Sequence, residues 1–123
     1  ENMARVLIVD DSPTQLMGIQ RIVEKLGHET FTATDGAAGV EAAKANLPDL
    51  VLMDVVMPNL NGFQATRTLK REASTSHIPV IIVTTKDQET DKVWGKRQGA
   101  KDYLTKPVDE ETLVKTLNAV LAG

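Results

Sequence analysis

Short apolar runs separated by longer amphipathic segments are the feature that most constrains this 123-residue chain. Three runs are continuous, at 6–9, 50–53 and 80–83, and two weaker ones lie at 30–34 and 101–104. A strand covered by helices on both faces is apolar throughout, whereas a half-exposed strand alternates. The pattern therefore predicts an α/β fold in which five parallel strands alternate with helices and form a doubly wound sheet. The strand order 2-1-3-4-5 is expected by analogy with other sheets of this class.

The segments between the runs carry signals for helix ends. Ser12 can cap a first helix, with Pro13 in its first turn and Gly27 just after its end. Asp109 can cap a last helix in the same way. The other expected helices cover 38–45, 61–71 and 87–98.

Composition limits the classes of partner and compartment. We expect one domain over residues 3–123, and we expect Glu1 and Asn2, which precede Met3, to be foreign residues left from expression. The net charge of -3 gives no basic face for nucleic acid, and no apolar run reaches the roughly 18 residues of a membrane span. The absence of cysteine excludes disulfides and thiolate metal sites, which is typical of a cytoplasmic protein.

Polar side chains stand at the point where each predicted strand ends. Because the carboxyl ends of parallel strands share one edge of a sheet, we expect these side chains to meet there. Any one of them could merely cap a helix or begin a turn, but their repetition at successive strand ends favours a site. They are Asp10 and Asp11, Asp54, Thr84 and Lys106.

This set of side chains predicts metal-dependent phosphoryl chemistry. Two like charges about 4 Å apart repel by roughly 4 kcal/mol at an effective dielectric constant near 20, so three carboxylates need more compensation than Lys106 alone supplies. An all-oxygen site favours Mg²⁺, with Mn²⁺ as an alternative, over zinc. A carboxylate can attack phosphorus, and Asp54 is the best candidate because it stands alone after the central strand. Lys106 and the hydroxyl of Thr84 would then contact phosphoryl oxygens.

Other phosphate-handling classes fit less well. The chain has neither the glycine-rich phosphate loop of nucleotide hydrolases nor a dinucleotide fingerprint after its first predicted strand. An aspartyl-phosphate phosphatase would need a second aspartate two residues after Asp54, and Val56 stands there. A flavin-binding protein of this fold would need a Ser/Thr-rich loop where Asp10 and Asp11 stand.

The chain resembles the receiver domain of two-component response regulators over essentially its whole length. The residues that carry the resemblance are Asp10-Asp11, 52–58, Asn61-Gly62, Val83-Thr84, 99–104 and Lys106-Pro107. The resemblance implies a five-stranded flavodoxin-like domain that a histidine kinase, of the CheA-like type, phosphorylates on Asp54. It further implies that Asp11 binds Mg²⁺ directly, that Asp10 acts largely through water, and that the Val56 carbonyl completes the set. It also implies a cis bond between Lys106 and Pro107 and a signalling domain that catalyses only its own phosphorylation and dephosphorylation.

The same resemblance implies a switch and an output face. Thr84 and Tyr103 match the pair that rearranges on phosphorylation, and the helix at 87–98, the strand at 101–104 and the last helix would form the surface that a downstream protein reads. We expect Lys92, Trp94, Lys96 and Tyr103 to contribute to it. The alternatives are that Trp94 packs against its own helix, that the two lysines are simply solvated, and that Tyr103 is an ordinary core aromatic.

Within the family, the stretch 80–122 is similar to a stand-alone regulator of type IV pili, and 92–97 carries part of that closer likeness. This implies a role in twitching motility or chemotaxis-like control. Output is expected through protein contact, since no DNA-binding domain follows Gly123. A receiver that drains phosphate from the same pathway is the alternative.

Overall fold

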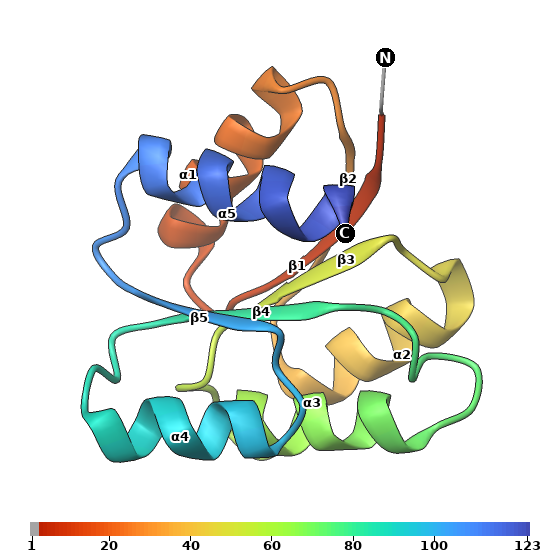
Figure 1. The fold of residues 1–123 in the computed structure, drawn as a ribbon. Helices are drawn as coiled ribbons and strands as arrows, with labels where there is room; N and C mark the ends of the chain where they lie inside the picture. The colour runs from red at the N-terminus through yellow and green to blue at the C-terminus, as the bar shows by residue number, and fades with distance from the viewer. Residues whose placement is uncertain (1–2) are drawn as a thin grey trace.

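The computed structural model describes residues 3–123, so the two residues expected to be foreign lie outside the described part of the chain. Five strands and five helices alternate along it (Figure 1). The strands are β1 (Arg5–Val9), β2 (Glu29–Ala33), β3 (Leu50–Met53), β4 (Val80–Thr84) and β5 (Asp102–Thr105). The helices are α1 (Pro13–Lys25), α2 (Gly36–Asn46), α3 (Gly62–Arg71), α4 (Glu89–Arg97) and α5 (Glu110–Ala122).

The strands form one parallel sheet in the order β2-β1-β3-β4-β5, which confirms the predicted topology. β1 and β3 are neighbours, and Val9, the last residue of β1, pairs with Met53, the last residue of β3. The residues that follow, Asp10 and Asp54, therefore leave the sheet side by side. The central position of β3 explains why its four residues are all buried.

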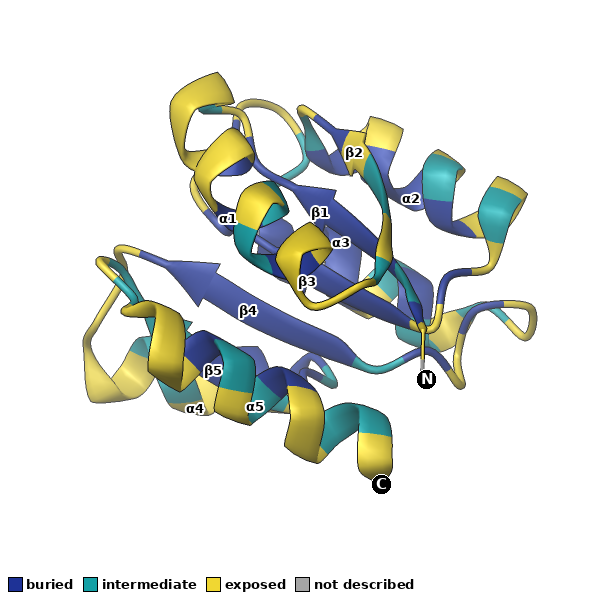
Figure 2. Cartoon of the chain, turned by 90° about the horizontal axis from the view of Figure 1, so that it is seen from above, coloured by how far each residue is buried: buried dark blue, intermediate teal, exposed yellow. Residues whose placement is uncertain are grey.

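Helices cover both faces of the sheet, α1 and α5 on one side and α2, α3 and α4 on the other (Figure 1). Alternate residues of β1 enter different cores: Val6 and Ile8 pack with α1 and α5, whereas Leu7 and Val9 pack with α2 and α3. Figure 2 shows the result, with the buried strands β1, β3 and β4 inside and the outer sides of the helices exposed. The continuous apolar runs therefore follow from burial on both faces.

The helix ends follow the caps that the sequence contains, with small shifts. The Ser12 side chain accepts a hydrogen bond from the backbone of α1, and Gly27 follows that helix with φ of +94°. α4 begins at Glu89 rather than at the predicted residue 87, because Gln88 is the capping residue and its N–H donates to Asp91. β2 and β5 are each displaced by one residue from their predicted ranges. None of the described helices has the length and apolar character of a membrane span.

Candidate functional site

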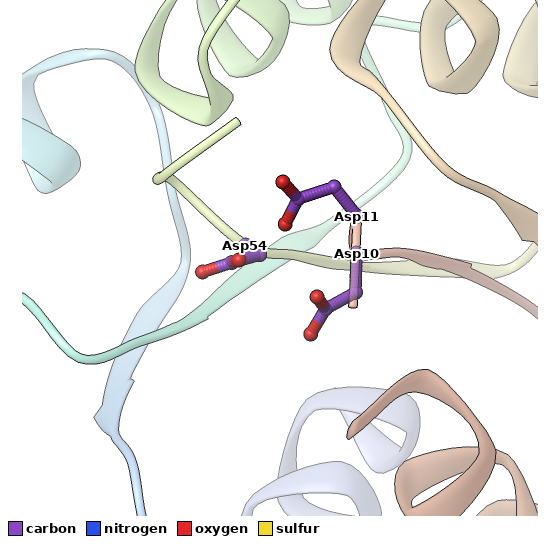
Figure 3. Close-up of side chains that lie close together, drawn as sticks. All are labelled: Asp10, Asp11 and Asp54. Atoms are coloured by element: carbon purple, nitrogen blue, oxygen red, sulfur yellow. The ribbon is translucent and has the colours of Figure 1, made fainter. Parts of the chain in front are cut away.

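Three carboxylates meet at the carboxyl ends of β1 and β3 (Figure 3). One oxygen from each of Asp10, Asp11 and Asp54 lies within 4.8 Å of the others. Asp10 and Asp54 are buried, and Asp11 is exposed. The juxtaposition follows from the pairing of β1 with β3, which delivers both strand ends to the same point.

The ammonium group of Lys106 lies against this cluster. Its Nζ is 2.6 Å from Oδ2 of Asp10 and 3.8 Å from Oδ2 of Asp54, and little of the lysine side chain is exposed. The backbone positions it: the N–H of Lys106 donates to the carbonyl of Thr84 at 2.7 Å, and the bond to Pro107 is cis, as the family resemblance implies. The same ammonium also donates to the side-chain oxygen of Gln15, on the first turn of α1.

The surroundings of Asp54 disfavour the charged form of its carboxyl group. Burial raises its pKa most, Lys106 counteracts this, and the nearby Asp10 raises it further. The Thr84 hydroxyl and the N–H of Val55, which donates to Oδ1 of Asp54 at 2.9 Å, favour the charged form. The pKa is raised overall, so one lysine does not balance the cluster. An all-oxygen site with surplus negative charge fits a hard divalent cation such as Mg²⁺.

We expect Asp54→Asn to raise the free energy of unfolding at neutral pH in buffer with a metal chelator. Well below pH 3.8, the ordinary pKa of this side chain, the folded and unfolded chains both hold the proton. As the pH rises, the unfolded chain releases the proton first, so the folded state loses stability until the pH passes the raised pKa. The gain from Asp54→Asn should therefore be larger at neutral pH than in acid.

Urea denaturation at neutral and acid pH measures this effect. Asp109→Asn is the matched control: the pKa of Asp109 is lowered, chiefly by the hydrogen bond from the Thr112 backbone. That carboxylate therefore favours the fold when it is charged, and its replacement should not stabilise the chain. A gain from Asp54→Asn that grows in acid would contradict the expected charge state.

Of the predicted switch pair, Thr84 contacts the carboxylate of Asp54, and Tyr103 belongs to the apolar cluster that includes the next residue, Val55. Thr84 is fully buried at the end of β4. Tyr103 is 8% exposed, and its hydroxyl donates to the carbonyl of Lys86 at 2.7 Å. Burial, followed by the charge of Asp91, raises the pKa of the Tyr103 hydroxyl to about 12. The ring is thus part of the core, and its role as a switch stays a prediction.

Trp94 is one of the residues expected on the output face. Its side chain is 47% exposed and lines a hollow of about 480 Å³ that Val56 and Lys86 also line. Trp94 therefore borders the loop after Asp54, a position that the sequence did not indicate. Lys92 forms an ion pair with Glu89 at 3.7 Å, and Lys96 is exposed. The part that these residues and the Val56 carbonyl play stays a prediction.

Comparison with known proteins identifies the class to which this fold and site belong. The family model for the response regulator receiver domain matches residues 6–118, and the chain belongs to that family. Receiver domains take phosphate from histidine kinases and bind Mg²⁺ at an acidic pocket. The chain is 69% identical to Protein PilH of Pseudomonas aeruginosa over 121 residues, which cover 98% of this chain and 100% of that protein.

Solved structures agree with this classification. The chemotaxis protein CheY4 of Vibrio cholerae is 34% identical, with a TM-score of 0.90, and the match covers 96% of this chain and 98% of that one. The receiver domain of the Pseudomonas aeruginosa sensor kinase PA1611, whose structure has a magnesium ion in its active-site cleft, is 27% identical with a TM-score of 0.91, over 98% and 99% of the two chains. Several other curated relatives are longer, and the chain spans from 24% to 53% of their length.

Proposed function

We propose that residues 3–123 form a single receiver domain that accepts a phosphoryl group on Asp54 from a histidine kinase. The observation that carries the proposal is the position of Asp54: a buried carboxylate after the central strand, close to two other carboxylates and to the ammonium of Lys106. With a divalent cation held by the carboxylates, this arrangement would neutralise charge on a phosphoryl group, which is most of what the catalysis of phosphoryl transfer requires. We infer that the domain catalyses only its own phosphorylation and dephosphorylation.

The transfer can be written with the residues of this chain. A carboxylate oxygen of Asp54 attacks the phosphorus of a phosphohistidine, the P–N bond breaks, and the leaving nitrogen keeps the electron pair. Lys106 and Thr84 donate to phosphoryl oxygens. Mg²⁺ (or Mn²⁺), held by Asp10, Asp11, Asp54 and the Val56 carbonyl, would supply the remaining positive charge. In dephosphorylation, which is a separate reaction, water attacks the phosphorus, the P–O bond to Asp54 breaks with its electron pair kept by the carboxylate, and inorganic phosphate leaves.

The test is phosphorylation by a small-molecule donor such as acetyl phosphate with Mg²⁺, followed by mass spectrometry of the intact chain. We expect a mass gain of one phosphoryl group, which Asp54→Ala abolishes. Asp87→Ala, at an exposed aspartate, is the matched control and should keep the gain. A phosphoryl group that persists in Asp54→Ala would refute the assignment of the acceptor.

We expect Mg²⁺ to raise the free energy of unfolding, since it should bind the folded cluster and not the unfolded chain. At a concentration about 100 times its dissociation constant, the gain should be about 2.7 kcal/mol. Asp11→Asn should remove most of this gain, whereas Glu111→Gln, at an exposed acid on α5, should keep it. Denaturation with and without Mg²⁺ measures the effect, and an equal gain in both variants would place the ion elsewhere.

Phosphorylation would signal through the surface formed by α4, β5 and α5. The phosphoryl group adds charge and acceptor oxygens at Asp54, and a shift of Thr84 toward them would alter the packing of Tyr103. The coupling to partner binding should be about 1 to 3 kcal/mol. The 69% identity to Protein PilH and the sequence resemblance support a CheA-like kinase as donor and a cytoplasmic role in type IV pilus or twitching control.

A further inference from the structure

Gly95 occupies an unusual place in α4. It is the buried residue of a nine-residue helix whose other positions are exposed or partly exposed. Apart from proline, glycine is the residue least suited to a helix interior, because it loses the most backbone freedom there. A glycine in the middle of so short and polar a helix therefore requires a structural reason.

The reason is the close approach of Tyr103. A Cβ atom at Gly95 would lie 2.9 Å from Cδ2 and 3.0 Å from Cε2 of the tyrosine ring, and 3.0 Å from Cδ1 of Ile82. Non-bonded carbon atoms normally stay about 3.5–4.0 Å apart. The ring thus packs directly against the backbone of α4. Gly18, in the interior of α1, provides a contrast, because a Cβ there would have nothing within 4 Å.

The ring has little freedom to yield at this position. Its hydroxyl is tied to the carbonyl of Lys86 at 2.7 Å, and the ring belongs to a buried cluster with Phe63 and Ile82. Ile82 is itself fully buried in β4. β5 is the edge strand of the sheet, so the space open to a displaced ring is the outer side of that strand.

We propose that Gly95 is the positioning residue for Tyr103: the missing side chain at 95 leaves the room that the ring occupies beneath α4, and a side chain there would displace the ring outward. The effect of this ring position on signalling rests on the proposed function, since Tyr103 is one of the two expected switch residues. In this receiver, the helix backbone at Gly95 would then determine how readily the switch tyrosine leaves the core.

The test compares Gly95→Ala with the matched control Gly18→Ala, with no phosphodonor present. The chain has one tyrosine, so its signals are unambiguous. In nuclear magnetic resonance spectra, Gly95→Ala should lose the contacts between the Tyr103 ring and the Ile82 methyl groups, and Gly18→Ala should keep them. Retained ring contacts in Gly95→Ala would overturn the proposal.

Ionisation of the phenol gives a second measurement. The inward ring faces the charges of Asp91, Asp87 and Asp54, and its pKa is raised, mainly by burial, from 10.0 to about 12. At pH 10 the hydroxyl should then be about 1% ionised, and about half ionised once the ring is exposed. Ultraviolet absorbance of the phenolate should rise accordingly in Gly95→Ala and stay low in Gly18→Ala. An unchanged absorbance in Gly95→Ala would count against the proposal.

A second variant covers the case in which Gly95→Ala does not fold. Combining it with Tyr103→Leu removes the ring that the new methyl group meets, so the double variant should fold; failure of both would overturn the proposal. Phosphoryl uptake on Asp54 is measured separately. Absence of uptake in the unsubstituted chain would refute the proposed function without changing the result for the ring.

Discussion

Lys106→Met should lower the free energy of unfolding by about 3–5 kcal/mol at neutral pH in metal-free buffer, the range for removing one partner of a buried ion pair. The ammonium lies 2.6 Å from Asp10 and 3.8 Å from Asp54, and both carboxylates are buried. Methionine has a similar length, so packing is largely kept while the charge is lost. What remains is a pair of buried carboxylates with no fixed cation, and their repulsion opposes folding.

Two conditions should restore much of the stability that Lys106→Met loses. Acid should do so because protonation removes the charge of the carboxylates, and Mg²⁺ should do so because it replaces the missing positive charge. Urea denaturation at neutral pH, in acid and with Mg²⁺ measures both effects. Lys25→Met is the matched control: the ion pair of Lys25 with Glu110, at 2.9 Å, is slightly longer and is exposed, so removing it should lower the free energy of unfolding by no more than about 1 kcal/mol. Equal losses for the two lysines would contradict the account of the site.

Gly62→Ala should lower the free energy of unfolding by at least about 3 kcal/mol, at the upper end of what overpacking costs. Gly62 is the first residue of α3, and a Cβ there would lie 1.9 Å from the carbonyl oxygen of Asp54 and 2.7 Å from Cα of Val55. These are backbone atoms, so no side-chain rotation can relieve the overlap. The N–H of Gly62 also donates to the carbonyl of Val55 at 3.0 Å, which fixes the helix against this loop.

The overlap should affect binding as well as stability, because the loop that must move carries Asp54. We expect Gly62→Ala to weaken the stabilisation by Mg²⁺ even under conditions in which the variant is folded. Gly18→Ala is the control for the intrinsic effect of the substitution, and it should stabilise α1 by up to about 1 kcal/mol, since its Cβ meets nothing. Denaturation curves with and without Mg²⁺ give both quantities. A Gly62→Ala variant as stable as the unsubstituted chain would show that the loop yields freely.

The sequence predicted the features of the fold that depend on burial and on local capping. The apolar run at 50–53 is continuous because β3 is covered on both faces, and the residue that follows it, Asp54, lies in the cluster where the sequence placed it. Ser12 and Asp109 cap the helices that they were expected to cap. In each case the residues that determine the structure lie within a few positions of the element that they form, so the pattern can be recognised in one sequence.

Features that depend on packing between distant segments were not predictable in this way. Gln15 reaches Lys106 from 91 positions away in the sequence, and no local pattern marks it. The side of α4 on which Trp94 lies follows from how that helix packs on the sheet. Because α4 is mostly polar, the spacing of its apolar residues does not indicate which side faces the sheet. Gly95 reads as an unfavourable helix residue until the ring of Tyr103 is placed beneath it.

The carboxylate of Asp10 has two possible partners in the site. It is the carboxylate nearest to the Lys106 ammonium, and it also belongs to the group of oxygens that could hold a cation. An ion that enters the cluster therefore competes with the lysine for the same carboxylate. Binding of a cation would therefore weaken the contact between Asp10 and the ammonium, and would leave Lys106 freer to contact an incoming phosphoryl group.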